Sequence, residues 1–211
     1  MLNRFKNIFR KHSGIEIADT LDSMGYFQYA DPSDVELLKQ EISNAYEAWG
    51  MISSIHALEN GIHYPKDYRL YSLDNEALFE QGGYHKYLAE IEPTTKKLNI
   101  SIYVEDELEE YSPTNGITHS LSINGVKYRI FEQFRDFSRA GTIAAKKFIE
   151  IINNVLVLQQ SHEKVYPIGS GTSGQLIFLT PEQFRFIYAV YPDNDNKPLP
   201  LKEWARKHGI R

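Results

Sequence analysis

The most distinctive pattern in this chain is a regular alternation of polar and apolar residues on both sides of one Asn-Gly pair. Residues 118–123 and residues 126–130 alternate, and Asn124 and Gly125 separate the two runs. Both central residues of a tight two-residue turn adopt positive φ, which asparagine and glycine tolerate best. The pattern therefore predicts an antiparallel β-hairpin.

The register of this hairpin assigns each side chain to one of two faces. The pairs on the apolar face are Ile123 with Val126, Leu121 with Tyr128, and His119 with Ile130. The polar face holds Ser120, Ser122, Lys127 and Arg129. Because a sheet with one apolar face needs a cover, we expect helices from elsewhere in the chain to pack on it.

Helical periodicity marks most of the remaining elements. Apolar residues recur three and four positions apart over 35–49, after a helix start at Asp31 and Pro32 and before a stop at Gly50. The other expected helices cover residues 2–12, 75–81, 84–98, 142–158, 180–188 and 201–205, and Pro93 should kink or restart the third of these. The other expected strands cover residues 67–73, 99–104, 165–168 and 175–179.

These elements are grouped by type and do not strictly alternate. Helices come first, followed by a three-strand meander, an apolar helix, a second pair of strands and two terminal helices. This order favours an α+β fold with an antiparallel sheet covered by helices. We expect a single domain over residues 1–211, in which a helical portion of about 1–62 packs on a sheet-containing body of 63–211.

Composition restricts the chemistry available to the chain. Its 211 residues include no cysteine, which excludes disulfides, thiol nucleophiles and cysteine-ligated metal sites. The apolar runs are too short for a membrane span and no secretory signal is apparent, so we expect a cytoplasmic protein without stable membrane insertion. The usage of Lys, Asn, Ile and Tyr is typical of AT-rich bacterial sequences.

Charge is unevenly distributed along the chain. Residues 1–12 carry +4 and residues 202–211 carry +3, so a net charge of −5 leaves −12 on residues 13–201. An acidic body disfavours nucleic acid, whose phosphates need clustered cations, and favours a basic protein partner. The basic segment 2–12 also has an apolar face, so it could pack on the body, lie on an anionic membrane surface or bind a partner.

An acidic run is the main candidate for binding such a partner. Its members, expected in a loop between two strands, are Glu105, Asp106, Glu107, Glu109 and Glu110. They are strung along the chain and do not converge around a sharp turn as calcium ligands do, so we expect no metal site. The two remaining interpretations are a solvated surface and a docking patch for a basic partner.

A glycine motif follows the predicted strand at 165–168. Gly169, Gly171 and Gly174 match the G-x-G-x-x-G pattern of dinucleotide-binding loops. In those loops the third glycine opens a helix whose amides bind the pyrophosphate, whereas residues 175–179 are predicted to form a strand. We therefore expect a hairpin loop and no cofactor, although its amides could hold an anion or a carboxylate of a partner.

The candidates for catalysis are His119, Tyr128 and Glu132. On the apolar face of a hairpin, His119 is either a hydrogen-bonded core residue or a general base. The seven histidines show no metal-binding spacing, and the chain contains no nucleophile elbow or kinase motif.

Two classes of function remain. The favoured one is a non-enzymatic binding protein, of adaptor or immunity type, that uses an acidic surface and exposed aromatic residues such as Tyr111 and Tyr191 to bind a basic protein partner. The alternative is a small hydrolase or transferase with a site assembled from His119 and the 169–174 loop. A cleft that joins His119, a carboxylate and this loop would favour the enzyme, and a flat acidic and aromatic face would favour binding.

Overall fold

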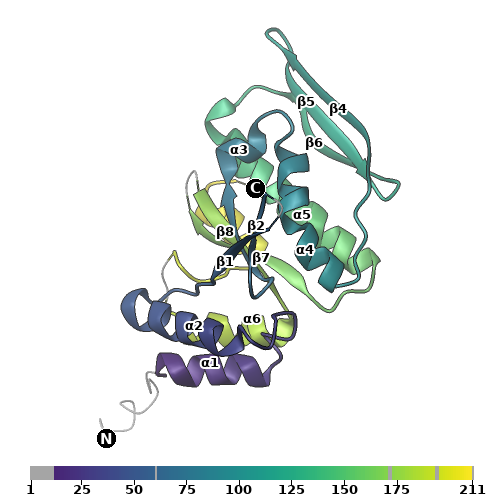
Figure 1. The fold of residues 1–211 in the computed structure, drawn as a ribbon. Helices are drawn as coiled ribbons and strands as arrows, with labels where there is room; N and C mark the ends of the chain where they lie inside the picture. Colours follow the sequence, from purple (N-terminus) through teal and green to yellow (C-terminus); the bar gives the residue numbers. More distant parts are fainter. Residues whose placement is uncertain (1–11, 60, 171–172, 193–194, 211) are drawn as a thin grey trace, which may run out of the picture.

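The computed structural model of the protein describes residues 12–59, 61–170, 173–192 and 195–210. Within these ranges, helices and three antiparallel sheets form an α+β fold, as the sequence predicted (Figure 1). The basic helix predicted over residues 2–12 lies outside the described residues, except for His12.

The strands form a central sheet, a second sheet and a separate hairpin. The central sheet has the order β3 (Leu70–Asp74), β8 (Ser173–Leu179), β7 (Lys164–Ser170). The second sheet has the order β4 (Val104–Ser112), β5 (Gly116–Ile123), β6 (Val126–Phe134). The hairpin consists of β1 (His56–Glu59) and β2 (Ile62–Pro65).

The helices lie on both sides of the central sheet (Figure 1). They are α1 (Gly14–Ser23), α2 (Val35–Trp49), α3 (Asn75–Phe79), α4 (Gly83–Lys97), the 3₁₀-helix η1 (Phe137–Arg139), α5 (Ala140–Leu158), α6 (Pro181–Val190) and α7 (Leu201–Lys207). The predicted capping box at the start of α6 is confirmed, because Thr180 and Gln183 each accept a backbone hydrogen bond from the other.

The central sheet separates two hydrophobic cores. Successive residues of a strand point to opposite faces. Leu70 and Ile177 therefore pack with α1, α2 and α6, whereas Tyr71 and Phe178 pack with α3, α4 and α5. The apolar helix α5 contacts both three-stranded sheets, so the second sheet is attached to the body through this helix.

Three expectations for the second sheet and its surroundings need correction. The pairs Ile123–Val126 and Leu121–Tyr128 are confirmed, but His119 pairs with Phe131 and not with Ile130. A β-bulge causes the shift, because it sets two residues of β6 against one residue of β5. The acidic run 105–110 lies in strand β4, and not in a loop before the hairpin. Residues 99–103, expected to form that strand, precede it.

Other differences concern helix boundaries and two elements that periodicity did not reveal. Helix α2 has Asp34 as its N-cap, because the Asp31 side chain accepts the amide of Ser33 at 2.9 Å and forms a turn before the helix. Pro93 lies inside the single helix α4 and does not restart it. Helix α1 and the β1–β2 hairpin were not predicted.

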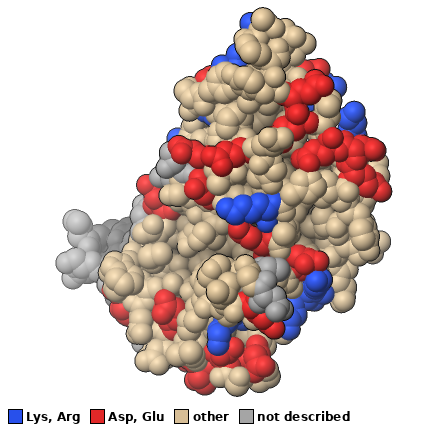
Figure 2. All heavy atoms as spheres, turned by 45° about the horizontal axis from the view of Figure 1, so that its top comes forward, with Lys and Arg blue, Asp and Glu red and all other residues tan. Residues whose placement is uncertain are grey.

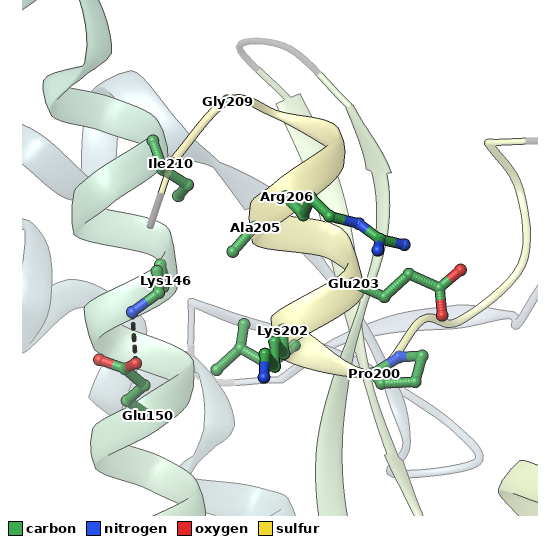
Figure 3. Close-up of a pocket in the computed structure, with 10 residues that line it drawn as sticks. Lys146, Glu150, Pro200, Lys202, Glu203, Ala205, Arg206, Gly209 and Ile210 are labelled. Carbon is green, nitrogen blue, oxygen red and sulfur yellow. Dashed lines mark hydrogen bonds and ion pairs between the residues drawn. The ribbon is translucent and has the colours of Figure 1, made fainter.

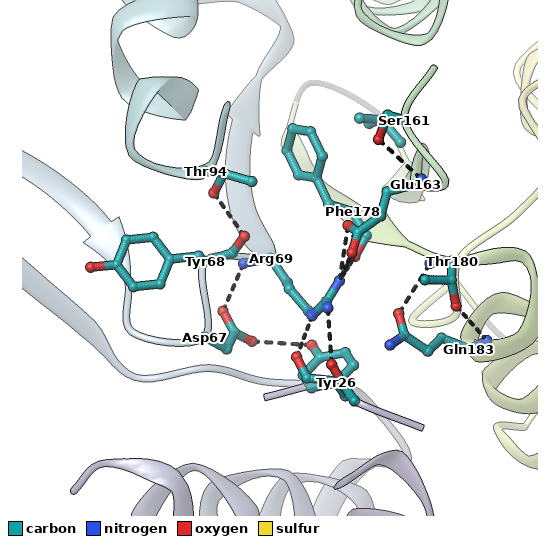
Figure 4. Close-up of polar contacts among 12 residues, drawn as sticks. Tyr26, Asp67, Tyr68, Arg69, Thr94, Ser161, Glu163, Phe178, Thr180 and Gln183 are labelled. Carbon is teal, nitrogen blue, oxygen red and sulfur yellow. Dashed lines mark hydrogen bonds and ion pairs between the residues drawn. The ribbon is translucent and has the colours of Figure 1, made fainter. Parts of the chain in front are cut away.

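A buried ion pair joins elements that are distant in sequence (Figure 4). The guanidinium of Arg69, just before β3, has no exposed surface, and Nη1 lies 3.0 Å from both carboxylate oxygens of Glu163, just before β7. The same side chain donates to the carbonyl of Phe178 at 2.9 Å and to the carbonyl of Tyr26. One arginine thereby connects three strands to the turn between α1 and α2.

A second buried carboxylate completes this network. Asp67 has no exposed surface and accepts hydrogen bonds from the backbone amide of Arg69 at 3.0 Å and from the Tyr26 hydroxyl at 3.1 Å. The rings of Tyr26 and Tyr29 lie 4.9 and 5.0 Å from the guanidinium carbon. Burial raises the pKa of Asp67, although hydrogen bonds and the charge of Arg69 oppose that effect.

Removing one partner of this ion pair should strongly destabilise the fold. In Glu163→Ala, Arg69 keeps its charge in a buried position without a carboxylate, so we expect the free energy of unfolding to fall by about 3–5 kcal/mol. Urea unfolding measures this loss. Glu132→Ala breaks an exposed pair with Arg129 and should cost less than about 1 kcal/mol. Equal effects of the two variants would contradict the role of the buried pair.

The raised pKa of Asp67 predicts a specific pH dependence of stability. The carboxyl of Asp67 takes up its proton at a higher pH in the native state than in the unfolded chain. Protonation of Asp67 therefore increases the free energy of unfolding as the pH falls through the native pKa. The free energy of unfolding of the wild type, minus that of Asp67→Asn, should rise on acidification and level off below about pH 3.9. Asp136→Asn provides a control, because hydrogen bonds from Ser138 and Arg139 lower the pKa of Asp136. For this variant the same difference should fall on acidification. A difference for Asp67 that falls on acidification would refute this prediction.

Candidate functional site

Strand β4 carries the whole acidic run along one edge of the second sheet. Glu109 and Tyr111 pair with His119 and Ile117 of β5, so they lie on the sheet face that is turned toward the core. A bulge between Glu105 and Leu108 interrupts the pairing. It contains Asp106, whose φ is 47°. Because side chains of a strand alternate, Glu109 and Glu110 lie on opposite faces, and the bulge places Glu105 opposite Ser122 on the polar face.

One acid of this strand bridges two histidines. Glu107 accepts a hydrogen bond from Nε2 of His119 at 3.1 Å and, through its other oxygen, contacts Nε2 of His85 in the first turn of α4. His119 is 4% exposed, and its ring packs edge-on against Tyr84 at 5.2 Å between centroids. These contacts make His119 a hydrogen-bonded core residue that attaches β5 to β4 and, through Glu107, to α4.

Two further acids of β4 accept backbone hydrogen bonds. Glu105 accepts the amide of Gly125 in the hairpin turn at 3.2 Å, and Glu109 accepts the amide of Gly82 at 3.3 Å. Gly82 is the N-cap of α4, where a carboxylate satisfies a free amide and interacts favourably with the helix dipole. Part of the acidic run therefore holds the second sheet on the body.

A groove of about 510 Å³ lies beside these acids, between one end of β4 and the segments α3 and η1. The residues that line it are Phe79, Glu80, Gln81, Glu109, Glu110, Tyr111, Ile117 and Phe137. The ring of Phe137 lies 6.4 Å from that of Phe79 and 6.3 Å from that of Tyr111. Three carboxylates and three aromatic rings thus share a groove whose described lining contains no Lys, Arg or His.

The exposure of this groove distinguishes it from the core beneath. Tyr111 is 69% exposed, as expected, and Phe137 is 48% exposed, whereas Tyr191, also expected to be exposed, is buried at 3% in the core beneath α6. Glu80 and Glu110 are exposed at its rim, whereas Glu109 is half-buried. The groove can therefore surround the apolar stem of a ligand side chain while its carboxylates contact a cationic head.

The structure separates the residues proposed for catalysis. The Tyr128 hydroxyl accepts a hydrogen bond from Asn154 of α5 at 2.7 Å, and Glu132 pairs with Arg129 on the exposed surface. Gly169 and Gly174 pair with each other inside β7 and β8, so the predicted hairpin forms but its strands extend into the 169–174 segment that was expected to be a loop. Gly171 lies outside the described residues. None of these groups has a described contact with His119.

The described ranges contain no group of three or more His, Asp or Glu side chains arranged so that they could hold a metal ion. His85, Glu107 and His119 form a hydrogen-bonded chain, which uses both oxygens of the carboxylate. The helices of the described residues also include none that is long and apolar enough to cross a membrane.

A larger groove, of about 1030 Å³, lies between α5 and α7 (Figure 3). Its charged groups have both signs, and Lys146 forms an ion pair with Glu150 on the α5 wall. The Glu203 carboxylate accepts a hydrogen bond from Tyr188. Lys146, Glu150 and Glu203 thus have partners within the protein, whereas no described contact pairs the side chains of Lys202 and Arg206, so the lining mixes free cations with paired groups of both signs.

Figure 2 shows acidic side chains in several groups over one face of the molecule, with Lys and Arg between them. Comparison with protein-family models, curated proteins and solved structures gave no match. The functional interpretation of the candidate site therefore rests on the geometry and chemistry of its residues.

Sequence reasoning found one wall of this groove and missed the other. It selected Glu109 and Glu110 because they belong to an acidic run, but Phe79, Glu80 and Phe137 come from segments 20 or more residues away. The sequence contains 14 Tyr and 11 Phe, but this composition does not indicate that Phe79 and Phe137 would be the ones beside β4.

The hydrogen bonds of Glu107 predict a stability effect that its exposed neighbours lack. In Glu107→Ala, the buried Nε2 of His119 loses its described partner, so we expect a loss of about 1–3 kcal/mol in the free energy of unfolding. Glu110→Ala, in the same strand but exposed, should change it by less than about 0.5 kcal/mol. Urea unfolding of both variants tests this, and a loss in Glu107→Ala no larger than that in Glu110→Ala would contradict it.

Proposed function

We propose that this protein is a non-enzymatic binding protein, of adaptor or immunity type, whose acidic and aromatic groove takes basic side chains of a protein partner. The observation that carries this proposal is the lining of the groove: Glu80, Glu109 and Glu110 beside Phe79, Tyr111 and Phe137, with no cation among the described lining residues. This combination suits arginine and lysine better than any other side chain.

The chemistry of recognition follows from the two kinds of group in the groove. The aliphatic stem of arginine or lysine packs on aromatic rings, and its charged head is attracted to the ring faces. Carboxylates at the rim accept charge-assisted hydrogen bonds, which are about twice as strong as neutral ones. The −12 charge of residues 13–201 would also attract a basic partner over longer distances.

The same electrostatics guide our remaining expectations for partner and location. An acidic face repels the phosphates of nucleic acid, so we expect a protein partner. A chain without cysteine needs no oxidising compartment, and we propose the cytoplasm as its location. The enzymatic alternative receives no support from the described contacts, because His119, Tyr128, Glu132 and the glycine hairpin each have other partners.

A synthetic peptide tests the preference of the groove for cations. The probe is a labelled eight-residue peptide with arginine and valine in alternation, and its control replaces each arginine with citrulline, which keeps the shape but removes the charge. Fluorescence anisotropy should detect binding of the arginine peptide, weakened by salt, and at least tenfold weaker binding of the citrulline peptide. Equal affinities for the two peptides, or no binding of either, would refute the proposed function.

Variants of the protein then locate the binding site. Each lost carboxylate contact should cost about 1 kcal/mol, so Glu110→Gln should weaken binding of the arginine peptide about fivefold. Asp106→Asn removes one charge from the same strand outside the groove and should change the affinity less than twofold. Glu80→Lys combined with Glu110→Lys should weaken binding at least tenfold. Glu107 is left intact in these tests because it holds His119. Equal effects of Glu110→Gln and Asp106→Asn would show that the groove is not the site.

A further inference from the structure

Strand β4 leaves one of its backbone edges open beside the groove. In the sheet order β4-β5-β6, β5 is central and β4 pairs only with β5 among the described strands. Figure 1 shows this sheet extending away from the rest of the molecule. An edge strand presents unpaired amide and carbonyl groups, to which another extended chain can add.

The part of β4 that is suited to such pairing is also the part that borders the groove. From Leu108 to Ser112 the strand pairs with β5 without interruption, whereas the bulge distorts the preceding residues. Glu109, Glu110 and Tyr111 lie in this regular stretch and line the groove. Leu108 is 43% exposed and Tyr111 is 69% exposed, so the stretch also offers apolar contact area.

We propose that the basic segment of the partner binds in an extended conformation, as a fourth strand along Leu108–Ser112. Side chains of a strand alternate between two faces. One set of the alternate side chains would therefore point to the face that carries Glu109 and Tyr111, where the groove begins. Backbone hydrogen bonds would supply affinity, and the acidic and aromatic groove would select basic residues. This inference rests on the proposed function and specifies how the partner is bound.

Charge distinguishes a basic segment from the other occupant of an open edge, a second copy of this chain. Five of the nine residues of β4 are acidic. Pairing of β4 with β4 would place carboxylates opposite carboxylates, and like charges directly across a sheet are destabilising. A strand with arginine or lysine at alternate positions would place opposite charges there. The acids thus oppose self-association at this edge and favour a basic strand.

Backbone methylation of the peptide tests the proposed pairing on the unaltered protein. Two further versions of the arginine–valine peptide carry two N-methyl groups each, one on the central arginines and the other on the central valines. Amides of alternate residues point to opposite edges of a strand, so only one set can pair with β4. We expect one methylated peptide to bind at least tenfold more weakly than the parent, and the other within about threefold of it.

The outcomes separate this inference from the function on which it rests. Both methylated peptides binding like the parent would overturn strand addition while leaving the cation-selective groove in place. Equal weakening of both by tenfold or more would also overturn it, because pairing along one edge requires a difference between the two sets. Failure of the parent peptide to bind would refute the proposed function itself. Slower amide hydrogen exchange within residues 108–112 on binding of the parent would provide independent support.

Discussion

The buried guanidinium of Arg69 is the constraint on which the arrangement of the central sheet depends. Its hydrogen bonds reach Glu163 before β7, a carbonyl of β8 and the turn between α1 and α2, while its own backbone leads into β3. A charge without exposed surface has no water to stabilise it, so these partners must all be present when the chain folds. This requirement favours one relative position of the elements over other compact arrangements.

The two hydrophobic cores follow from this arrangement. A strand that is buried on both faces sends alternate side chains into different cores, so Tyr71 and Leu70 pack against separate sets of helices. The Arg69 network lies at the ends of these strands, where the N-terminal helices meet the sheet. The N-terminal portion is thus joined to the body by polar contacts as well as by apolar burial.

The acids of β4 fall into two groups according to what surrounds them. Glu107 and Glu109 turn toward the body, where imidazole and amide groups provide hydrogen bonds, and they help to hold the second sheet at the start of α4. Glu110 remains exposed beside Tyr111. Only the acids that keep exposed oxygens are available to a partner, which is why a count of charges along the sequence overstates the size of a docking surface. Glu109 belongs to both groups, because it lines the groove and also accepts a hydrogen bond from the backbone amide of Gly82.

The sequence by itself determined the elements whose signals are local. The Asn124-Gly125 turn, the capping box at Thr180, the stop at Gly50 and the apolar face of α5 were predictable because each depends on residues within a few positions. The α+β class followed from their order. Tertiary structure alone decided the bulge that pairs His119 with Phe131, the inclusion of the acidic run in an edge strand, and the meeting of Phe79 and Phe137 with β4. These features depend on contacts between distant segments, and hydrophobic periodicity carries no information about which distant segments will meet.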